Sequence, residues 1–515
     1  MSHTVLLINP PIYDFAAYDF FNKPLGLLYI ASFLRRVGYQ VRLIDCLDRN
    51  HPSLQKLPQL PKSRPNGTGK YFSRIIETPT CLKHVPRHYR RYGLGPEQFA
   101  QALETETTNH RPMAVLVTSM MTYWYRAVAD TIKHIRLALP GVPVALGGVY
   151  ATLMPEHARA HCAADVVFTG RAQIPLLKWL DSIASVCHRD YQGLSDDFAA
   201  WPAPAYDLYP RLDYLTLMTS LGCPFRCDYC ASGLLQPRLE QLEPQLLIEQ
   251  INKLLPLLAR PRDHFDIAFM DDALLARPET HIIPILELLK ETNKCCEKGF
   301  LSFPRRACPE RSRMGRESMF SDEKTVSESM NPLLRGGRMF EQQQRSNLPL
   351  RFHCPNGLHC RLITPQVANL MYGNHFQMIR LSFESADAAP LWQQAGDHKV
   401  ADRDLAQAVE NLEKAGFKRS QLEAYILTGL PGQTMNEIEQ SADFVHNLRV
   451  QLRLCQYSPI AGTRLFEISP RRYGIDPDEP LLHNNSILPA LDKRVSFAAF
   501  QQFKNHVAQL NRSLG

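Results

Sequence analysis

Three cysteines, Cys223, Cys227 and Cys230, have the spacing C-x-x-x-C-x-x-C within the stretch LMTSLGCPFRCDYCASGLL. Three thiolates this close in sequence can hold one small metal centre and leave it one ligand short. Iron–sulfur clusters are normally held by four cysteines, so a cluster held by three keeps one iron open for a substrate or cofactor. A zinc knuckle needs a fourth Cys or His at similar short spacing, and none follows nearby. The pattern therefore favours a reactive iron–sulfur centre over the two alternatives, zinc or buried thiols that act as small hydrophobic side chains.

Composition and charge are those of an ordinary globular chain long enough for two or three domains. Of its 515 residues 45% are hydrophobic and 21% are charged, and no apolar run reaches the length of a membrane span. The opening MSHTVLLINPP lacks the features of a secretory signal, and thirteen unevenly spaced cysteines do not suggest a disulfide framework. We therefore expect a cytoplasmic protein without membrane contact, since an exposed iron cluster requires reducing conditions.

The basic residues give a modest net charge of +7. They are partly concentrated in RHYRRYG (87–93) and in the segment from 304 to 351. A nucleic-acid-binding surface needs a basic stripe interleaved with aromatic residues on an ordered face, and residues 87–93 offer at most a small one. A solvated loop is the simpler interpretation, so nucleic-acid binding is not expected.

The first third of the chain alternates apolar strand-like runs with helical periodicity. This β-α-β rhythm predicts a doubly wound parallel sheet of the flavodoxin or Rossmann-like type over residues 1–185. Residues 51–110 form an excursion of low periodicity, either a lid or a surface loop. The expected strands are 4–9, 40–45, 113–119, 142–148 and 164–170.

Small and polar residues follow the ends of three of these strands. They are Asn9 and Pro10, then Ser119, then Gly147 and Gly148. In such sheets the ligand lies beyond the carboxyl ends of the strands, and glycines allow its close approach. We therefore expect these residues to bind a cofactor; the alternative is that the two glycines only make a turn.

A second β-α series follows a proline-containing linker at 186–210. Its spacing predicts a partial (β/α)6 barrel of the TIM type over 211–465, whose chemistry sits at the carboxyl ends of its strands. Residues 466–515 are expected to add a helical extension that closes the barrel or meets a partner. The expected strands begin at 214, 266, 350, 377, 422 and 452. The residues at their carboxyl ends include Asp271, Asp272, Ser382, Glu384, Ser385, Gly429, Pro431 and Gly432.

One segment, 297–348, interrupts this series. It is polar, basic and aperiodic, which predicts a disordered insertion. Its CPERSRMGRES core resembles the translation products of dispersed palindromic DNA repeats, so we expect the insertion to be dispensable.

Taken together, these motifs resemble the radical S-adenosylmethionine (SAM) superfamily, and more narrowly its members with an N-terminal cobalamin-binding-type Rossmann domain. Besides the cysteines, Tyr229 supplies the aromatic residue that family members carry just before the third cysteine. The resemblance covers nearly all of the chain except 297–348 and the extreme C-terminus. Supporting strings are TSMMTYWY, GGVYATLMPEH, FMDDALL, FHCPNGLH, LSFES and GLPGQ.

The resemblance implies that Cys223, Cys227 and Cys230 hold a [4Fe-4S] cluster whose fourth iron is chelated by SAM. Reductive cleavage of SAM then gives a 5′-deoxyadenosyl radical, chemistry that the cofactor carries while the protein excludes water and aims the radical. Ser382, Glu384 and Ser385 would hydrogen-bond the ribose hydroxyls and the methionine ammonium. The loop 429–432, with Gly429, Pro431 and Gly432, would pack against the adenine.

Asp271 and Asp272 stand where many relatives have a glycine-glycine-glutamate string that binds the amino group of SAM. This chain departs from that string, which leaves three roles open. The two carboxylates bind the cofactor amine, accept a proton from substrate, or cap the following helix.

Cobalamin binding is also implied, but without a histidine ligand for cobalt. Domains that ligate cobalt through histidine carry D-x-H-x-x-G after the first strand, whereas this chain reads NPPIYDF there. Several radical SAM enzymes are thought to bind cobalamin without such a ligand. The expectation of cobalamin binding therefore rests on the glycines at the strand ends.

The leading hypothesis is a cobalamin-linked radical SAM enzyme that methylates or rearranges an unactivated carbon of a small-molecule or peptide substrate. An electron donor such as flavodoxin or ferredoxin is its expected partner. One alternative keeps the radical chemistry but lets the Rossmann domain bind substrate or a partner; another is a non-catalytic metal-binding protein.

Overall fold

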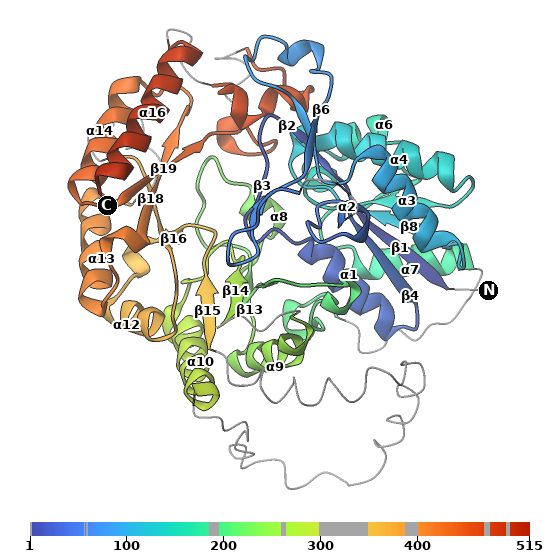
Figure 1. The fold of residues 1–515 in the computed structure, drawn as a ribbon, viewed down its shortest axis with the longest axis horizontal. Helices are drawn as coiled ribbons and strands as arrows, with labels where there is room; N and C mark the ends of the chain where they lie inside the picture. Colours follow the sequence, from blue (N-terminus) through green and yellow to red (C-terminus); the bar gives the residue numbers. More distant parts are fainter. Residues whose placement is uncertain are drawn as a thin grey trace, which may run out of the picture.

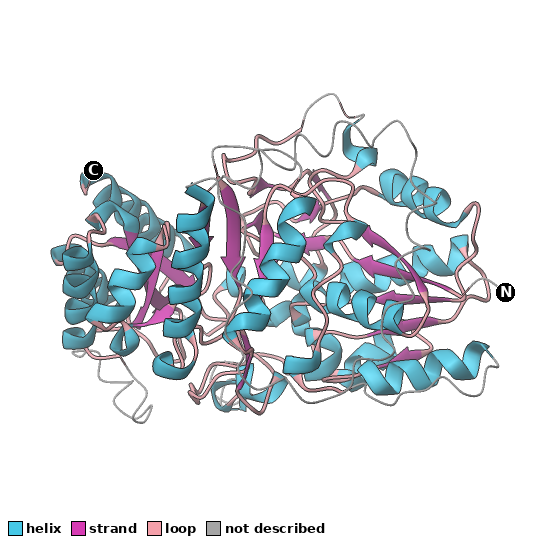
Figure 2. Ribbon diagram, turned by 90° about the horizontal axis from the view of Figure 1, so that it is seen from below, coloured by secondary structure: helices cyan, strands magenta, loops and turns pink. Residues whose placement is uncertain are grey.

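The computed structural model consists of an N-terminal half and a C-terminal half that pack side by side (Figure 1). Strands lie inside both halves and helices outside them (Figure 2). The residues that the structure describes are 3–55, 57, 60–184, 195–258, 264–297, 349–386, 400–467, 474–490 and 495–514. The predicted insertion at 297–348 lies outside these residues except for its first position, where a helix ends. Part of the linker at 186–210 lies outside them as well.

The N-terminal sheet is parallel and has the strand order β10-β9-β8-β1-β4. The parallel sheet was predicted, and its strand order was not. Numbered along the chain, the order is the flavodoxin order 2-1-3-4-5, and its switch point lies between β1 and β8. The apolar run of β1 is buried at every position, as a strand covered on both faces requires. The strands are β1 (Thr4–Asn9), β4 (Gln40–Asp45), β8 (Ala114–Val117), β9 (Val144–Leu146) and β10 (Val166–Val167).

Helices cover both faces of this sheet. Val5 and Leu7 of β1 pack in the core that contains α1 (Leu25–Arg36) and α7 (Gln173–Ala184). Leu6 and Ile8 point to the opposite core. That core contains side chains of α3 (Pro96–Thr107), α4 (Tyr125–Ala138), α5 (Val149–Leu153) and α6 (Pro155–His161).

The excursion at 51–110 is more ordered than its sequence suggested. It contributes two strands to a small antiparallel sheet of order β2-β7-β6, which lies at one end of the N-terminal domain (Figure 1). Its last helix, α3, covers the main sheet, so only the part before it departs from the sheet domain. The short elements of the excursion are α2 (Pro52–Gln55), β5 (Gly69–Lys70), β6 (Ser73–Ile75) and β7 (Arg90–Tyr92). Two further short strands, β2 (Ile12–Asp14) and β3 (Tyr18–Asp19), precede it and pair with β7 and β5.

The C-terminal half has parallel strands at all six predicted positions. Together with the short β16, which was not predicted, they form one sheet of order β11-β14-β15 and another of order β16-β17-β18-β19, joined by a parallel bridge between Phe352 and Phe376. Within the described residues the strands do not close into a complete barrel, as expected of a partial barrel. The strands are β11 (Leu215–Leu217), β14 (Phe265–Phe269), β15 (Leu350–His353), β16 (Leu358–His359), β17 (Ile379–Glu384), β18 (Leu422–Thr428) and β19 (Gln451–Gln456).

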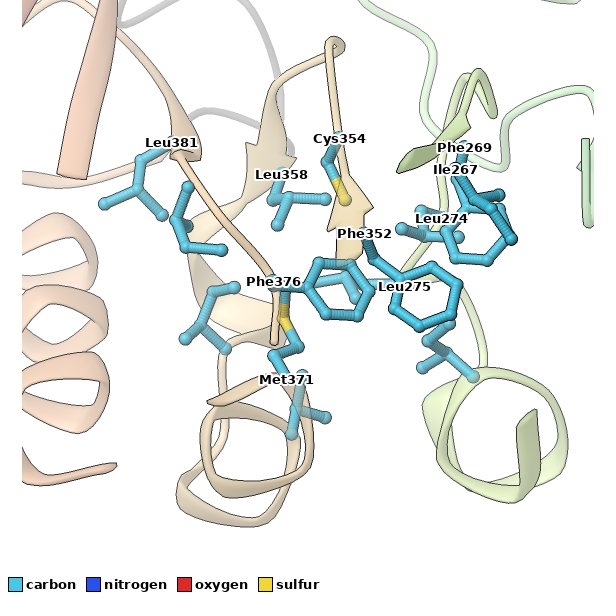
Figure 3. Close-up of a cluster of buried hydrophobic side chains, with 14 of the residues drawn as sticks. Ile267, Phe269, Leu274, Leu275, Phe352, Cys354, Leu358, Met371, Phe376 and Leu381 are labelled. Atoms are coloured by element: carbon cyan, nitrogen blue, oxygen red, sulfur yellow. The ribbon is translucent and has the colours of Figure 1, made fainter. Parts of the chain in front are cut away.

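Helices follow these strands and bury one face of the sheets. In this core the rings of Phe269 and Phe352 stack with centroids 5.4 Å apart, and Phe376 lies beside them (Figure 3). The helices are α9 (Pro244–Leu254), α10 (Ile282–Glu297), α12 (Pro365–Gly373), α13 (Asp402–Ala415), α14 (Met435–Asn447) and α16 (Phe497–Ser513). No helix in the described part of the chain is long and apolar enough to cross a membrane.

The inner face of the partial barrel is polar and is partly filled by the N-terminal domain. Asp266 on β14 accepts hydrogen bonds from Arg351 and lies 2.7 Å from Nε2 of His353. The buried ring of Phe21 packs on His353 with centroids 4.5 Å apart, and Phe20 lies under the Arg380 guanidinium at 4.4 Å. The N-terminal domain therefore helps to close the barrel from inside, which its sequence did not reveal.

Candidate functional site

The three cysteines lie on the loop that follows the first strand of the barrel. After β11 the chain forms β12 (Ser220–Leu221), which pairs antiparallel with β13 (Glu240–Gln241). Gly222 turns the chain into the loop at φ +83°, and a Cβ there would lie 2.4 Å from the Arg238 carbonyl oxygen. Only glycine fits this position without a shift of backbone, so the loop geometry is set one residue before Cys223.

The three thiols lie on one short loop and differ in burial. Cys223 and Cys227 are half-buried and Cys230 is exposed, and the Cys230 amide donates to the Cys227 carbonyl at 3.0 Å. Burial, with a smaller effect of the neighbouring negative charges, raises the pKa of Cys223 to about 11 and that of Cys227 to about 12. These two thiols therefore stay protonated at neutral pH until a metal displaces the protons.

The described residues contain no group of three His, Cys, Asp or Glu side chains arranged for a single metal ion. Tetrahedral zinc with Zn–S bonds of about 2.3 Å would bring its sulfur ligands to about 3.8 Å from one another. A cubane cluster has one iron for each cysteine and tolerates wider separations. A donor set of three thiols that is not arranged for a single ion therefore fits an iron–sulfur cluster better than zinc.

Tyr229 and Glu384, both predicted cofactor-binding residues, are brought together by the fold. The Tyr229 hydroxyl donates a short hydrogen bond to the Glu384 carboxylate. Glu384 has φ +74° and lies where the register between β17 and β18 shifts. Burial, followed by the charge of Glu384, raises the pKa of Tyr229 far above its ordinary value, so the phenol remains a donor. The fourth strand thus contacts the cysteine loop through a strained residue, which is typical of functional sites.

Asp271 supports the cysteine loop from below. Its side chain is buried, and Oδ1 accepts hydrogen bonds from the amides and hydroxyls of both Thr219 and Ser220. The Thr219 hydroxyl also lies 2.9 Å from Nε2 of the buried His281. These bonds fix the corner between β11 and β12 from which the loop starts. Asp272, in contrast, is exposed at the rim, and its predicted contact with cofactor or substrate stays a prediction.

This geometry predicts that Asp271→Ala and Asp271→Asn differ sharply. Alanine leaves two amides and two hydroxyls without their acceptor, at a cost on the order of 3 kcal/mol or more. Asparagine keeps an oxygen at the Oδ1 position, so most of the network persists. The melting temperature and the iron content after reconstitution should therefore be strongly reduced in Asp271→Ala and nearly normal in Asp271→Asn. An inactive but stable, iron-loaded Asp271→Asn would instead support the proton-acceptor role.

The remaining predicted barrel residues line the same rim. A Cβ on Gly357 would lie 2.2 Å from the Ser382 hydroxyl oxygen, so the third and fourth strand ends are in close contact; Ser385 nearby is buried. Gly429 and Gly432 have φ values of +76° and +79° and form a tight loop together with Pro431. Buried Gln433, which the sequence did not single out, closes this loop through hydrogen bonds to the Leu430 amide and the Leu427 carbonyl.

Ser119, Gly147 and Gly148 form one cradle at the carboxyl edge of the N-terminal sheet. The Ser119 hydroxyl donates to the Gly147 carbonyl at 2.7 Å and accepts from the Ala151 amide at 3.2 Å. Gly148 is exposed and has φ +98°, and a Cβ there would lie 2.3 Å from the Ser119 carbonyl oxygen. Glycine is therefore required at 148, and the cradle leaves its backbone accessible to a ligand.

Asn9 is held by the protein itself. Its side-chain amide donates to Asp45 at 2.7 Å, and Asp45 also accepts from the Tyr209 hydroxyl at 2.6 Å. The buried Lys23 lies 4.2 Å from the centre of the Tyr209 ring and 3.7 Å from the Asp48 carboxylate. Although burial opposes it, Asp48 and the other nearby carboxylates raise the pKa of Lys23, so the charge persists. This network joins the strand ends of the N-terminal sheet to the start of the barrel, with Pro10 buried beside it.

The two predicted sites lie next to a contact between the two halves. Helix α5, which begins after Gly148, packs against α8 (Ser232–Leu235), which begins two residues after Cys230. The segment 474–490 crosses from the barrel to the N-terminal domain, where the buried Asn484 side chain donates to Asp14 at 2.9 Å. The cysteine loop and the glycine cradle therefore line one region between the two halves.

The fold of this chain, a parallel sheet domain followed by a partial barrel, is similar to that of two solved structures. Both are of TsrM, a radical SAM methyltransferase from Kitasatospora setae. One, with tryptophan substrate and a SAM analogue bound, has a TM-score of 0.56 and 15% sequence identity, and the match covers 91% of this chain and 76% of that one. The other, with cobalamin and a [4Fe-4S] cluster bound, has a TM-score of 0.54 and 16% identity, covering 92% and 78%.

Sequence comparison finds matches that cover shorter parts of the chain, and no family model matches the chain. The chain is 24% identical over 181 residues to the cytidylyl-2-hydroxyethylphosphonate methyltransferase of Streptomyces wedmorensis, which is 35% of this chain and 28% of that protein. It is 26% identical over 147 residues to an uncharacterized methyltransferase of Pyrococcus horikoshii, which is 24% of this chain and 31% of that protein. The chain thus matches less than a third of the length of either relative.

Proposed function

We propose that this protein is a radical SAM enzyme that uses cobalamin to methylate a substrate carbon. The observation that carries the proposal is the contact between α5, which begins after Gly148 of the cradle, and α8, which begins two residues after Cys230 of the cysteine loop. A cluster held by three cysteines supplies one-electron reduction of SAM at its open iron, and cobalamin supplies a carrier for the methyl group. Rearrangement without methyl transfer becomes the less favoured reading because the two relatives above are named methyltransferases.

The residues around the cysteine loop have defined tasks in this proposal. Glu384 presents a carboxylate to the methionine ammonium of SAM, and the neutral phenol of Tyr229 fixes its direction. Ser382 and Ser385, on the same strand end, offer hydroxyls to the ribose. The backbone of the 429–432 loop is open to the flat face of adenine, because its glycines carry no side chain.

In the N-terminal domain the glycine cradle would hold the cobalamin. Its exposed backbone at Gly148 permits close approach, and the switch point of the sheet lies beside it, between β1 and β8. The exposed side chains of Met120 and Met121, which follow Ser119, add apolar surface at the same edge. Flat, largely apolar ligands favour such a surface.

The substrate and the electron donor are proposed by class. A small molecule or a peptide would enter between the two halves, and a one-electron donor such as flavodoxin or ferredoxin would reduce the cluster. Cys230 and Arg226 are exposed on the cysteine loop, which is compatible with approach of an acidic donor.

Anaerobic reconstitution with iron and sulfide tests the proposal. The protein should turn brown, absorb broadly near 400 nm, and form 5′-deoxyadenosine or S-adenosylhomocysteine from SAM when a reductant is present. It should also retain cobalamin through gel filtration. Uptake of zinc alone without any SAM consumption would overturn the radical assignment. SAM cleavage without cobalamin retention would instead assign the N-terminal domain to substrate or partner binding.

A further inference from the structure

Arg171 connects the two halves at the cysteine loop. It follows β10 of the N-terminal sheet, and its guanidinium donates to Gln236 Oε1 at 3.0 Å through Nε. Its two terminal nitrogens bind Glu240 in a fork, with distances of 2.9 Å and 2.8 Å to the two carboxylate oxygens. One of them also donates to the Asp196 carbonyl at 3.0 Å. Every nitrogen of the Arg171 guanidinium therefore has a hydrogen-bond or ion-pair partner.

The two side chains that Arg171 binds lie just outside the cysteine segment on its C-terminal side. Gln236 ends helix α8, six residues after Cys230. Glu240 pairs with Leu221, which lies two residues before Cys223. Because β12 and β13 are paired, the ion pair with Glu240 also restrains Leu221, from which the chain continues into the cysteine loop. Arg171 therefore holds both ends of the segment that carries the three thiols.

The contact is partly removed from solvent. The side chains of Arg171 and Glu240 are 20% and 26% exposed, and Trp201 lies 5.8 Å from the guanidinium. Although burial opposes it, the Arg171 hydrogen bonds and the Phe198 amide lower the pKa of Glu240. A half-buried bidentate Arg–carboxylate pair is directional, and lysine does not reproduce its geometry.

We propose that Arg171 is a positioning residue, which sets where the cysteine loop stands relative to the carboxyl edge of the N-terminal sheet. This inference rests on the proposed function in one respect. Methyl transfer needs the cysteine loop and the glycine cradle to be correctly aligned with each other, whereas SAM binding and cleavage need only the barrel. A misplacement of about 1 Å can cost up to 100-fold in a step that depends on alignment. Loss of Arg171 therefore uncouples SAM cleavage from methyl transfer.

The first test uses the full chain without cofactors and reads hydrogen exchange by mass spectrometry. Arg171→Gln should raise amide exchange at least several-fold in peptides covering 219–242, and Arg171→Lys should have a smaller effect. The matched control is Arg136→Gln. Arg136 makes a similar set of bonds, to Asp165 and two carbonyls, but all lie within the N-terminal domain. Equal exchange in the wild type and Arg171→Gln would overturn the proposal.

The second test uses reconstituted protein with SAM, cobalamin and reductant. In Arg171→Gln and in Glu240→Gln, iron content, cobalamin retention and reductive SAM cleavage should stay within about twofold of wild type. Transfer of the methyl group from SAM to cobalamin, read as S-adenosylhomocysteine formed, should fall on the order of tenfold or more. Parallel loss of both reactions, or loss of neither, would overturn the positioning role. If the wild type neither cleaves SAM nor retains cobalamin, the proposed function fails, and the exchange experiment still decides whether Arg171 holds the loop.

Discussion

Cys227→Ala is expected to abolish cluster assembly and, with it, all cleavage of SAM. Cys227 lies between Cys223 and Cys230 in the loop, and its side chain is half-buried beside Tyr229 and Glu384. With two cysteines left, a cubane would have two irons without protein ligands, and a cluster with so few anchors is lost on gel filtration. Iron content after anaerobic reconstitution, the absorbance near 400 nm and the yield of 5′-deoxyadenosine should all fall to background.

The matched control is Cys81→Ala. Cys81 is also a half-buried free cysteine, but it lies in the excursion of the N-terminal domain. This variant should keep wild-type iron content, which shows that removing a cysteine is not in itself harmful. Cys227→Ala protein that still binds four irons and cleaves SAM would contradict the assignment of the three cysteines as ligands.

The arrangement of strands could be predicted because their signals are local. Each strand is a short apolar run, such as 4–9 or 422–428, bounded by residues that end it. The alternation with helices then leaves few topologies. Strand β17 shows the limit of this reasoning. Its range was expected, but the register shift that turns Glu384 toward Tyr229 depends on neighbouring strands.

Residues that act through distant partners could not be predicted in the same way. Asp271 was expected to meet cofactor, substrate or the following helix, yet its hydrogen bonds go to Thr219 and Ser220, more than fifty residues earlier. Nothing in its local sequence encodes that distance. Arg171 was missed for the same reason, because a single arginine after a strand is common and its partner Glu240 lies 69 residues away.

The polar inner face of the barrel was also missed. Residues such as Asp266 alternate with the apolar residues that pack outward, and alternation of this kind is expected of any half-exposed strand. That Phe20 and Phe21 of the N-terminal domain cover this face follows only from the way the two halves pack. Predicting it requires the relative placement of domains, which hydrophobic periodicity does not contain.

Gly148→Ala is expected to damage the glycine cradle more than any other single methyl group added at this edge of the sheet. The new Cβ would lie 2.3 Å from the Ser119 carbonyl oxygen and 2.7 Å from its amide nitrogen, and neither backbone atom can turn away. The backbone at φ +98° and ψ −167° is also one that only glycine adopts without strain. Together these effects should cost about 3 kcal/mol or more, and lower the melting temperature by roughly 10 °C.

Retention of cobalamin should fall in the same variant, because relief of the overlap must displace the backbone that we propose the ligand contacts. Gly147→Ala is the control. It adds the same methyl group one residue earlier, where φ is ordinary and the nearest atom, the Phe168 carbonyl oxygen, is 3.9 Å away. That variant should melt within about 2 °C of wild type. Its cobalamin retention then separates the structural role of the cradle from a role in binding. If Gly147→Ala is stable but retains less cobalamin, the ligand contacts this turn directly. Full retention in both variants would show that the glycines are not part of the binding site.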